Sequence, residues 1–304
     1  MKPSHYLITG GTGFVGSAFI RSLPDGVKVS VLSRQGQDCL NQFENVSCEV
    51  AVIASLNHLN HLDDFDCVIN LAGEPIADKR WTKTQKQKIQ DSRWQTTSHI
   101  IKLLQASASP PSVFISGSAI GYYGRQSSTP VTEVEHNIND EFTHRLCATW
   151  ENIASGAQSE KTRVCMLRTG IVLGKGKGAL GKMTLPFSLG LGGPIGNGKQ
   201  GMSWIHIDDM VAGIHYLIAN DSLKGAFNFT APSPVSNAAF TKALGKALNR
   251  PTVIPMPAFA LNMLMGEASD LLLTGQFVLP QRLQEAGYNF IYPELQPALD
   301  AIFQ

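Results

Sequence analysis

The apolar positions of the first 170 residues fall into short continuous runs separated by longer helical patterns. Continuous runs of this kind predict strands that are buried on both faces, and they occur at 6–9, 27–32, 67–71, 112–116 and 164–168. Helical patterns at 84–106 and 140–157 are long enough to serve as right-handed crossovers between parallel strands. The pattern therefore predicts a doubly wound α/β domain with a parallel sheet.

After about residue 170 the pattern changes. Residues 170–201 are rich in glycine and include Pro186 and Pro194, which predicts a long loop acting as a lid or mobile wall of a cleft. Helices are expected at 208–219 and 236–248, with a strand at 226–229 and short helices between the prolines of the tail. We therefore expect a smaller, mainly helical second domain over 170–304.

Composition narrows the classes of function. The chain has 304 residues, of which 43% are apolar, and its 25 Lys and Arg nearly balance its 24 Asp and Glu. Such a balance gives no general attraction to nucleic acid or an anionic membrane, and no apolar run approaches the roughly 20 residues of a membrane span. Five cysteines without CxxC spacing suggest neither a disulfide framework nor a zinc site. We expect a cytoplasmic protein that binds a small molecule, with no metal, and its oligomeric state stays open.

A glycine-rich turn separates the first strand from an apolar helix. Its GxxGxxG spacing allows the backbone to approach a pyrophosphate, which would bind the free N–H groups at the helix start. The strand–turn–helix context favours dinucleotide binding over a plain βα turn. The candidate cofactor-binding residues of this turn are Gly10, Thr12, Gly13, Phe14, Val15 and Gly16.

The end of the second strand indicates which dinucleotide is bound. An NAD enzyme usually has a carboxylate there for the ribose 2′-hydroxyl, whereas this strand ends in Ser33 and Arg34. An arginine and a hydroxyl suit a 2′-phosphate, so NADP(H) is favoured over NAD(H), although Arg34 as a solvated surface residue is the alternative. Leu71, Ala72 and Gly73 end a later strand at the same sheet edge and complete the candidate cofactor set.

Together these segments resemble the extended short-chain dehydrogenase/reductase superfamily of the NAD(P)-dependent epimerase/dehydratase type. The resemblance covers roughly 1–230 and also rests on 116–119 (SGSA) and 204–209 (WIHIDD). A narrower resemblance, carried by 73–77 (GEPIA), 80–81 (RW) and 92–93 (SR), is to YfcH-type proteins with a DUF1731-like tail at about 237–299. It implies an NAD(P)-binding Rossmann domain over 1–169 and a substrate-side C-terminal domain over 170–304.

The catalytic pattern departs from that superfamily, whose members use a YxxxK pair. No tyrosine of this chain has a lysine four positions later. Aligned on Trp150 and Glu151, the resemblance places Thr143 at the tyrosine position and Cys147 at the lysine position, leaving only Ser118 in its superfamily place. Cys147 is more typical of a packed thiol than of a nucleophile.

Candidate replacements follow Ser118 along the chain. Tyr122 and Tyr123 lie on a loop after a predicted strand, where either can serve as the proton donor or as an aromatic wall. The proposed catalytic set is therefore Ser118, Tyr122 and Tyr123. His206 is interpreted as a structural residue.

Candidate substrate residues come from a basic, tryptophan-bearing segment and from the motifs of the resemblance. Arginine can hold a carboxylate or phosphate, and tryptophan can cover a flat or sugar-like molecule. These candidates are Glu74, Arg80, Trp81, Arg93 and Trp204. The leading hypothesis is an NADP(H)-dependent oxidoreductase or epimerase-like enzyme acting on a small polar molecule, either sugar-like or anionic. The alternative, favoured by the missing YxxxK pair, is a non-catalytic NADP(H)-binding redox sensor or scaffold.

Overall fold

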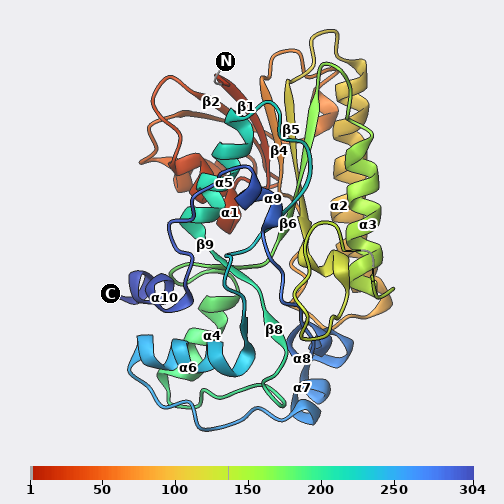
Figure 1. The fold of residues 1–304 in the computed structure, drawn as a ribbon. Helices are drawn as coiled ribbons and strands as arrows, with labels where there is room; N and C mark the ends of the chain where they lie inside the picture. Colours follow the sequence, from red (N-terminus) through yellow and green to blue (C-terminus); the bar gives the residue numbers. More distant parts are fainter. Residues whose placement is uncertain (1–2, 136) are drawn as a thin grey trace.

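The computed structural model describes residues 3–135 and 137–304. Its centre is a seven-stranded sheet in the order β10-β6-β5-β4-β1-β2-β3, with every neighbouring pair parallel (Figure 1). The strands are β1 (His5–Thr9), β2 (Lys28–Leu32), β3 (Glu49–Ile53), β4 (Cys67–Asn70), β5 (Val113–Ala119), β6 (Arg163–Thr169) and β10 (Gly225–Phe229). The predicted doubly wound parallel sheet is confirmed, and β3 adds an edge strand that the sequence pattern did not predict.

Helices cover both faces of this sheet. On one face lie α1 (Phe14–Arg21) and α5 (Ile207–Ala219), and on the other α2 (Lys83–Ala106) and α3 (Phe142–Ser155) (Figure 1). Two neighbouring residues of β1 explain the continuous apolar runs in the sequence. Ile8 packs in the core under α1 and α5, whereas Leu7 packs in the core under α2, so both faces of the strand need apolar side chains.

The glycine-rich segment 170–201 is not the long loop that its composition predicted. It contains β7 (Ile171–Leu173), α4 (Gly178–Ser188) and the start of β8 (Gly201–Met202). The reason is burial, because Leu180 and Phe187 of α4 pack in one core with Trp204 and Phe240. The prediction of a loop was therefore wrong, whereas the prediction that this segment forms part of a cleft wall is confirmed, because Met183, Ile195 and Gln200 line the cleft.

The C-terminal elements form a second lobe below the sheet (Figure 1). Its core lies between α4, α6 (Asn237–Leu248) and α10 (Leu295–Phe303). The remaining elements are β9 (Trp204–His206), β11 (Val235–Ser236), α7 (Ala258–Met265), α8 (Asp270–Leu273), α9 (Gln281–Glu285), η1 (Gly36–Phe43), η2 (Leu56–His58), η3 (Ile120–Tyr123) and η4 (Gly266–Ser269). None of the helices in the described part of the chain combines the length and apolar character that a membrane span requires.

The central sheet contains elements from both sides of the expected domain boundary at 169/170. The strand β10 pairs with β6, and the helix α5 packs on α1.

The buried Asp209 on α5 binds the C-terminal segment of the chain. Its carboxylate accepts hydrogen bonds from the Tyr288 hydroxyl at 3.0 Å, from Ile291 N at 2.7 Å and from Tyr292 N at 2.8 Å. The segment 288–292 is thereby held against α5.

Candidate active site

The glycine turn between β1 and α1 is closely packed. Gly10 has φ 69°, and a Cβ there would lie 2.7 Å from the carbonyl carbon of Leu71. A Cβ on Gly16 would overlap the carbonyl oxygen of Gly10. Gly13 caps α1 and donates its own N–H to Gly10 O at 3.0 Å, so no side chain covers the first N–H groups of the helix. This is the geometry of an anion site at a helix N-terminus.

A cleft of about 750 Å³ opens at the carboxyl ends of β1, β4 and β5. It brings together nine of the residues singled out in the sequence: Gly10, Gly13, Phe14, Val15, Gly16, Leu71, Trp81, Arg93 and Ser118. Phe14 packs closely on the backbone of Gly174. A Cβ added to Gly174 would lie 2.5 Å from the Phe14 ring. The glycine turn and Ser118 therefore face one continuous space.

Two other cofactor candidates, Ser33 and Arg34, are not among the residues that line this space. Ser33 is buried and Arg34 is exposed at the end of β2. Hydrogen bonds from Gln85 and Lys79, helped by the charge of Arg34, lower the pKa of the Glu74 carboxyl. Glu74 is thus held by its neighbours beside the cleft and does not line it.

The remaining cofactor candidates, Thr12, Ala72 and Gly73, are not among the residues that line the cleft. Ala72 N donates to Thr9 Oγ1 at 3.2 Å, and a Cβ on Gly73 would lie 2.8 Å from Cζ of Arg93. Gly73 therefore permits the close approach of Arg93 to the chain after β4.

Ser118 belongs to a buried polar network. Its hydroxyl donates to Glu151 Oε1 at 2.6 Å, and Arg168 holds both oxygens of that carboxylate, with Nε and Nη2 each at 2.8 Å. Because the Ser118 proton is directed at a carboxylate, its oxygen offers lone pairs to the cleft. In this network Ser118 can act only as an acceptor toward any further partner.

The structure does not place either tyrosine as the expected proton donor. Tyr123 is fully buried, donates to Asn228 Oδ1 at 2.7 Å and accepts from Arg168 Nη1 at 3.0 Å. Burial raises the pKa of Tyr123 to about 12. Tyr122 does not line the cleft either, because its ring is covered by Arg168, whose Cζ lies 3.5 Å from the ring centroid. Both residues support the network behind Ser118.

Two substrate candidates also lie away from the cleft. Trp204 is fully buried in the core of the second lobe, and its Nε1 donates to Ser233 O at 3.2 Å. Arg80 is exposed outside the cleft, next to Gly266. The expectation that Trp204 contacts substrate was therefore wrong, because tertiary packing buries it. The role of Arg80 in substrate binding stays a prediction.

Trp81 and Arg93 do line the cleft. The Trp81 ring meets Phe142 edge to face with centroids 4.9 Å apart, and its Nε1 donates to Ile76 O at 2.8 Å. Arg93 donates through Nη1 to the carbonyls of Glu74 and Ile89, each at 3.0 Å. Trp81 therefore contributes an aromatic wall, whereas Arg93 uses its hydrogen-bonding capacity to hold the chain after β4.

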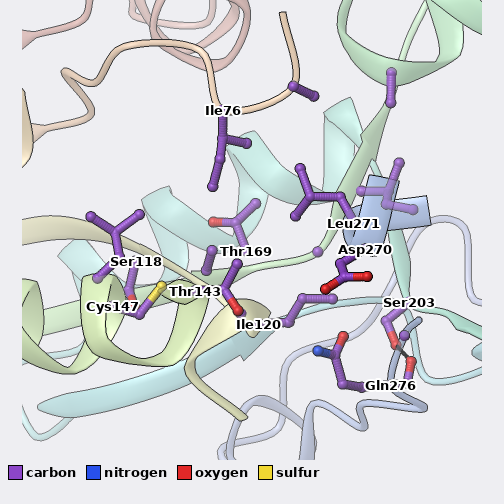
Figure 2. Close-up of a pocket in the computed structure, with 18 of the residues that line it drawn as sticks. Ile76, Ser118, Ile120, Thr143, Cys147, Thr169, Ser203, Asp270, Leu271 and Gln276 are labelled. Atoms are coloured by element: carbon purple, nitrogen blue, oxygen red, sulfur yellow. Dashed lines mark hydrogen bonds between the residues drawn. The ribbon is translucent and has the colours of Figure 1, made fainter. Parts of the chain in front are cut away.

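Thr143 and Cys147 lie beside Ser118 on one side of the cleft, with Asp270, Leu271 and Gln276 toward the other (Figure 2). Burial raises the pKa of the Cys147 thiol to about 12, so it stays protonated at neutral pH. Sequence reasoning missed the residues of the far wall, because only the fold brings the C-terminal segment over the ends of β5 and β6. In residues 3–135 and 137–304 no group of three His, Cys, Asp or Glu side chains could hold a metal ion.

A parallel seven-stranded sheet with a glycine turn at its first strand and a cleft at its carboxyl edge defines a dinucleotide-binding protein of the extended short-chain dehydrogenase/reductase type. The match to known sequences is more specific. The chain belongs to the NAD dependent epimerase/dehydratase family, whose model matches residues 6–229, and a domain of unknown function (DUF1731) matches 256–302. The resemblance noted in the sequence is confirmed.

Two of the relatives are named as epimerase family proteins. The epimerase family protein SDR39U1 homolog, chloroplastic, of Arabidopsis thaliana is 38% identical over 98% of this chain and 86% of its own length. The epimerase family protein SSP1921 of Staphylococcus saprophyticus is 37% identical over 97% of this chain and 98% of its own.

Solved structures show the same fold. The crystal structure of human SDR39U1 (isoform 2) with NADPH has a TM-score of 0.87 and 32% identity, covering 98% of each chain. A nucleoside-diphosphate sugar epimerase from Corynebacterium glutamicum has a TM-score of 0.76 and 28% identity, covering 99% of this chain and 58% of that one.

Proposed function

We propose that this protein is an NADP(H)-dependent oxidoreductase or epimerase-like enzyme that acts on a small molecule in the cleft beside Ser118. The observation that carries the proposal is the glycine turn at α1, which opens into the same cleft as Ser118. The absence of a carboxylate in the Ser33–Arg34 sequence at the end of β2 supports NADP(H), as does the NADPH in the crystal of the human relative.

The residues present fit this cofactor. The open N–H groups at the start of α1 would hold its pyrophosphate, and Arg34 with Ser33 would hold the 2′-phosphate. Leu71 lines the cleft next to the glycine turn and would contact the cofactor from the end of β4. When bound, the nicotinamide supplies hydride transfer, and the protein supplies orientation and control of a proton.

Ser118 is the residue that we assign to the substrate. Since its proton is committed to Glu151, its oxygen can accept a hydrogen bond from a substrate hydroxyl and fix that group in the cleft. The lost tyrosine is costly, because a general acid typically contributes about 100- to 10,000-fold in rate. Thr143 cannot replace it, since an aliphatic hydroxyl is far less acidic than a phenol. Turnover is therefore slow or depends on a proton from the substrate itself.

A second candidate function is a non-catalytic NADP(H)-binding redox sensor or scaffold. The observation that favours it is the chemistry of the cleft: among the described residues that line it, none is a tyrosine or a histidine. The Cys147 thiol beside Ser118 is also held protonated by burial, which raises its pKa to about 12. Such a site can bind a dinucleotide without a phenol or an imidazole to transfer the proton of a reaction.

Calorimetric titration of NADPH and NADH tests the cofactor assignment. We expect Arg34→Ala to weaken NADPH binding about tenfold or more and to leave NADH binding unchanged, because one charge-assisted hydrogen bond is lost. Lys28→Ala, an exposed cation at the opposite end of β2, is the matched control and should change neither affinity. Failure of the unmodified protein to bind NADPH would contradict both candidate functions.

A turnover assay distinguishes the two candidate functions, the enzyme and the non-catalytic sensor. NADPH absorbance is followed with a panel of carbonyl compounds, and NADP⁺ reduction with a panel of alcohols. Turnover that Ser118→Ala abolishes, with NADPH affinity intact, supports the enzyme. Tight NADPH binding without turnover on any compound supports the sensor.

We also propose a cytoplasmic location. All five cysteines are free and buried, as expected in a reducing compartment. Fractionation of cells that carry a tagged chain tests this proposal, and recovery of the tag outside the cytoplasm would contradict it.

A further inference from the structure

The helices α7, η4 and α8 form a segment, 258–273, that lies outside the apolar cores of the protein. Among the described residues, those cores include Leu248 and Val278 but no residue of 249–277. Within the segment α7 packs on η4, and η4 packs on α8. Three apolar side chains of α7 are exposed, namely Phe259, Met263 and Leu264. Burial of apolar surface therefore contributes little to holding this segment in place.

Both ends of the segment are anchored to the second lobe. Just before it, Met256 N donates to Pro194 O, and Met256 O accepts from Gly196 N, both at 2.9 Å. Near its end, Gln200 Nε2 donates to Leu272 O at 2.8 Å. A loosely packed segment between two anchored ends can move about those ends as a hinged unit.

The inner side of the segment lines the cleft. It contributes Glu267, Asp270, Leu271 and Leu272 to the lining. Figure 2 shows Asp270 and Leu271 on one side of the space and Ser118 on the other. A movement of the segment would therefore change access to the part of the cleft beside Ser118.

Two ion pairs fasten the segment across the cleft, and we call them the latch. Lys86 of α2 pairs with Glu267, and Arg125 pairs with Asp270 at 3.3 Å. More than half of each side chain of Arg125, Glu267 and Asp270 is exposed. Water and salt screen pairs as exposed as these, so the latch can break and form again at little cost.

We propose that 258–273 is a lid over the cleft, and that the latch holds it closed. Opening breaks the two ion pairs and widens the entrance, and closing forms them again. The role of the lid in admitting a substrate rests on the proposed function, which places a substrate in this cleft. Segments that admit ligands are drawn from the least stable parts of a structure, as the sparse burial of this segment requires.

Hydrogen exchange of the unmodified protein provides the first test. We expect the amides of 258–273 to exchange about tenfold or more faster than those of α6, which packs in the core of the second lobe. Raising the NaCl concentration from about 0.1 M to about 1 M should speed exchange in the lid about threefold or more, because salt screens the latch. It should leave α6 unchanged. Lid amides that exchange as slowly as those of α6 would overturn the proposal.

The double variant Lys86→Gln, Arg125→Gln removes the latch without changing the lid. Exchange in the lid should rise about threefold or more and should no longer respond to salt. The matched control, Lys83→Gln with Arg145→Gln, removes two exposed cations that do not pair with the lid. It should exchange like the unmodified protein. Unchanged lid exchange in the first variant, or an equal rise in the control, overturns the role of the latch.

Labelling of a thiol introduced into the cleft tests whether the lid controls access. Thr143 lines the cleft, and the five native thiols are buried. In Thr143→Cys, removal of the latch should speed labelling by bulky N-(1-pyrenyl)maleimide about threefold or more. Labelling by the smaller N-ethylmaleimide should keep its rate. An equal change in the two rates, or none, overturns the gating role. These measurements need no NADPH, so their failure differs from that of the proposed function, which NADPH titration reports.

Discussion

The Ser118 hydroxyl donates a 2.6 Å hydrogen bond to Glu151, and the buried guanidinium of Arg168 holds the same carboxylate. Replacing Arg168 by methionine leaves the Glu151 charge buried without its partner. We expect Arg168→Met to lower the free energy of unfolding by about 3–5 kcal/mol, measured by urea denaturation.

Arg145→Met is the control for that measurement, because Arg145 and Asp140 form an exposed pair. Exposed pairs contribute about 0–1 kcal/mol. The double variant Arg168→Met, Glu151→Leu should recover part of the lost stability, since it removes the unpaired charge. A loss below about 1 kcal/mol for Arg168→Met would contradict the stabilising role assigned to this buried pair.

The glycine turn offers a second prediction. In Gly16→Ala the new methyl group overlaps the carbonyl oxygen of Gly10, so the turn must open. We expect a loss of about 1–3 kcal/mol in stability, as for other overpacked sites, together with loss of NADPH binding in calorimetry. Gly26→Ala is the control, because its Cβ meets no atom within 4 Å and only its positive φ is unfavourable. Normal NADPH affinity in Gly16→Ala would refute the assigned role of the turn.

A third prediction concerns thiol reactivity. Burial raises the pKa of Cys147 to about 12 and that of Cys165 to about 11. The pKa values of these two thiols in the folded protein exceed the value of about 8.5 in the unfolded chain. Their contribution to the free energy of unfolding is therefore complete below about pH 8.5 and is lost as the pH rises toward 12. At pH 8 the folded protein should react slowly with Ellman's reagent, and all five thiols should react in urea. Rapid labelling of one thiol that Cys147→Ser prevents would identify a reactive cysteine instead.

Acid stability provides a fourth prediction. His206 caps α5, and its Nδ1 accepts a hydrogen bond from Asp208 N at 3.2 Å, which requires the neutral ring. Burial lowers the pKa of His206, against the opposing charges of Asp208 and Asp209. Its contribution is therefore present above the unfolded value of about 6.5 and is lost as the pH falls through the folded pKa.

We expect the free energy of unfolding to decline below pH 6.5, and to decline less in His206→Asn. Asparagine caps a helix without titrating in this range. Urea denaturation at pH 7 and at successively lower pH values measures the difference. Identical pH profiles for the two proteins would show that His206 stays neutral throughout or keeps its cap when charged.

Local sequence signals explain what could be predicted of this protein. The glycine turn needs close backbone approach at Gly10 and Gly16, and only glycine permits it. Strands buried on both faces leave continuous apolar runs. In contrast, β3 is an edge strand with residues of mixed exposure, and its pattern differs little from that of a loop.

What could not be predicted depends on contacts between distant segments. Tyr123 lies one residue after Tyr122, yet its burial is set by Arg168 and Asn228, which are far away in the chain. The buried position of Trp204 depends on α6 and α10 in the same way. The glycines of 170–201 suggested a loop, because the apolar residues Leu180 and Phe187 that order α4 are few and widely spaced.

The segment that matches DUF1731 supplies Asp270, Leu271 and Leu272 to the cleft. Its apolar side chains are divided between two cores: Leu283 and Tyr288 pack with the sheet, whereas Leu299 packs with α6. A segment with no interior of its own cannot be exchanged between proteins as an independent module. Separating it from the preceding chain would expose apolar surface on both parts.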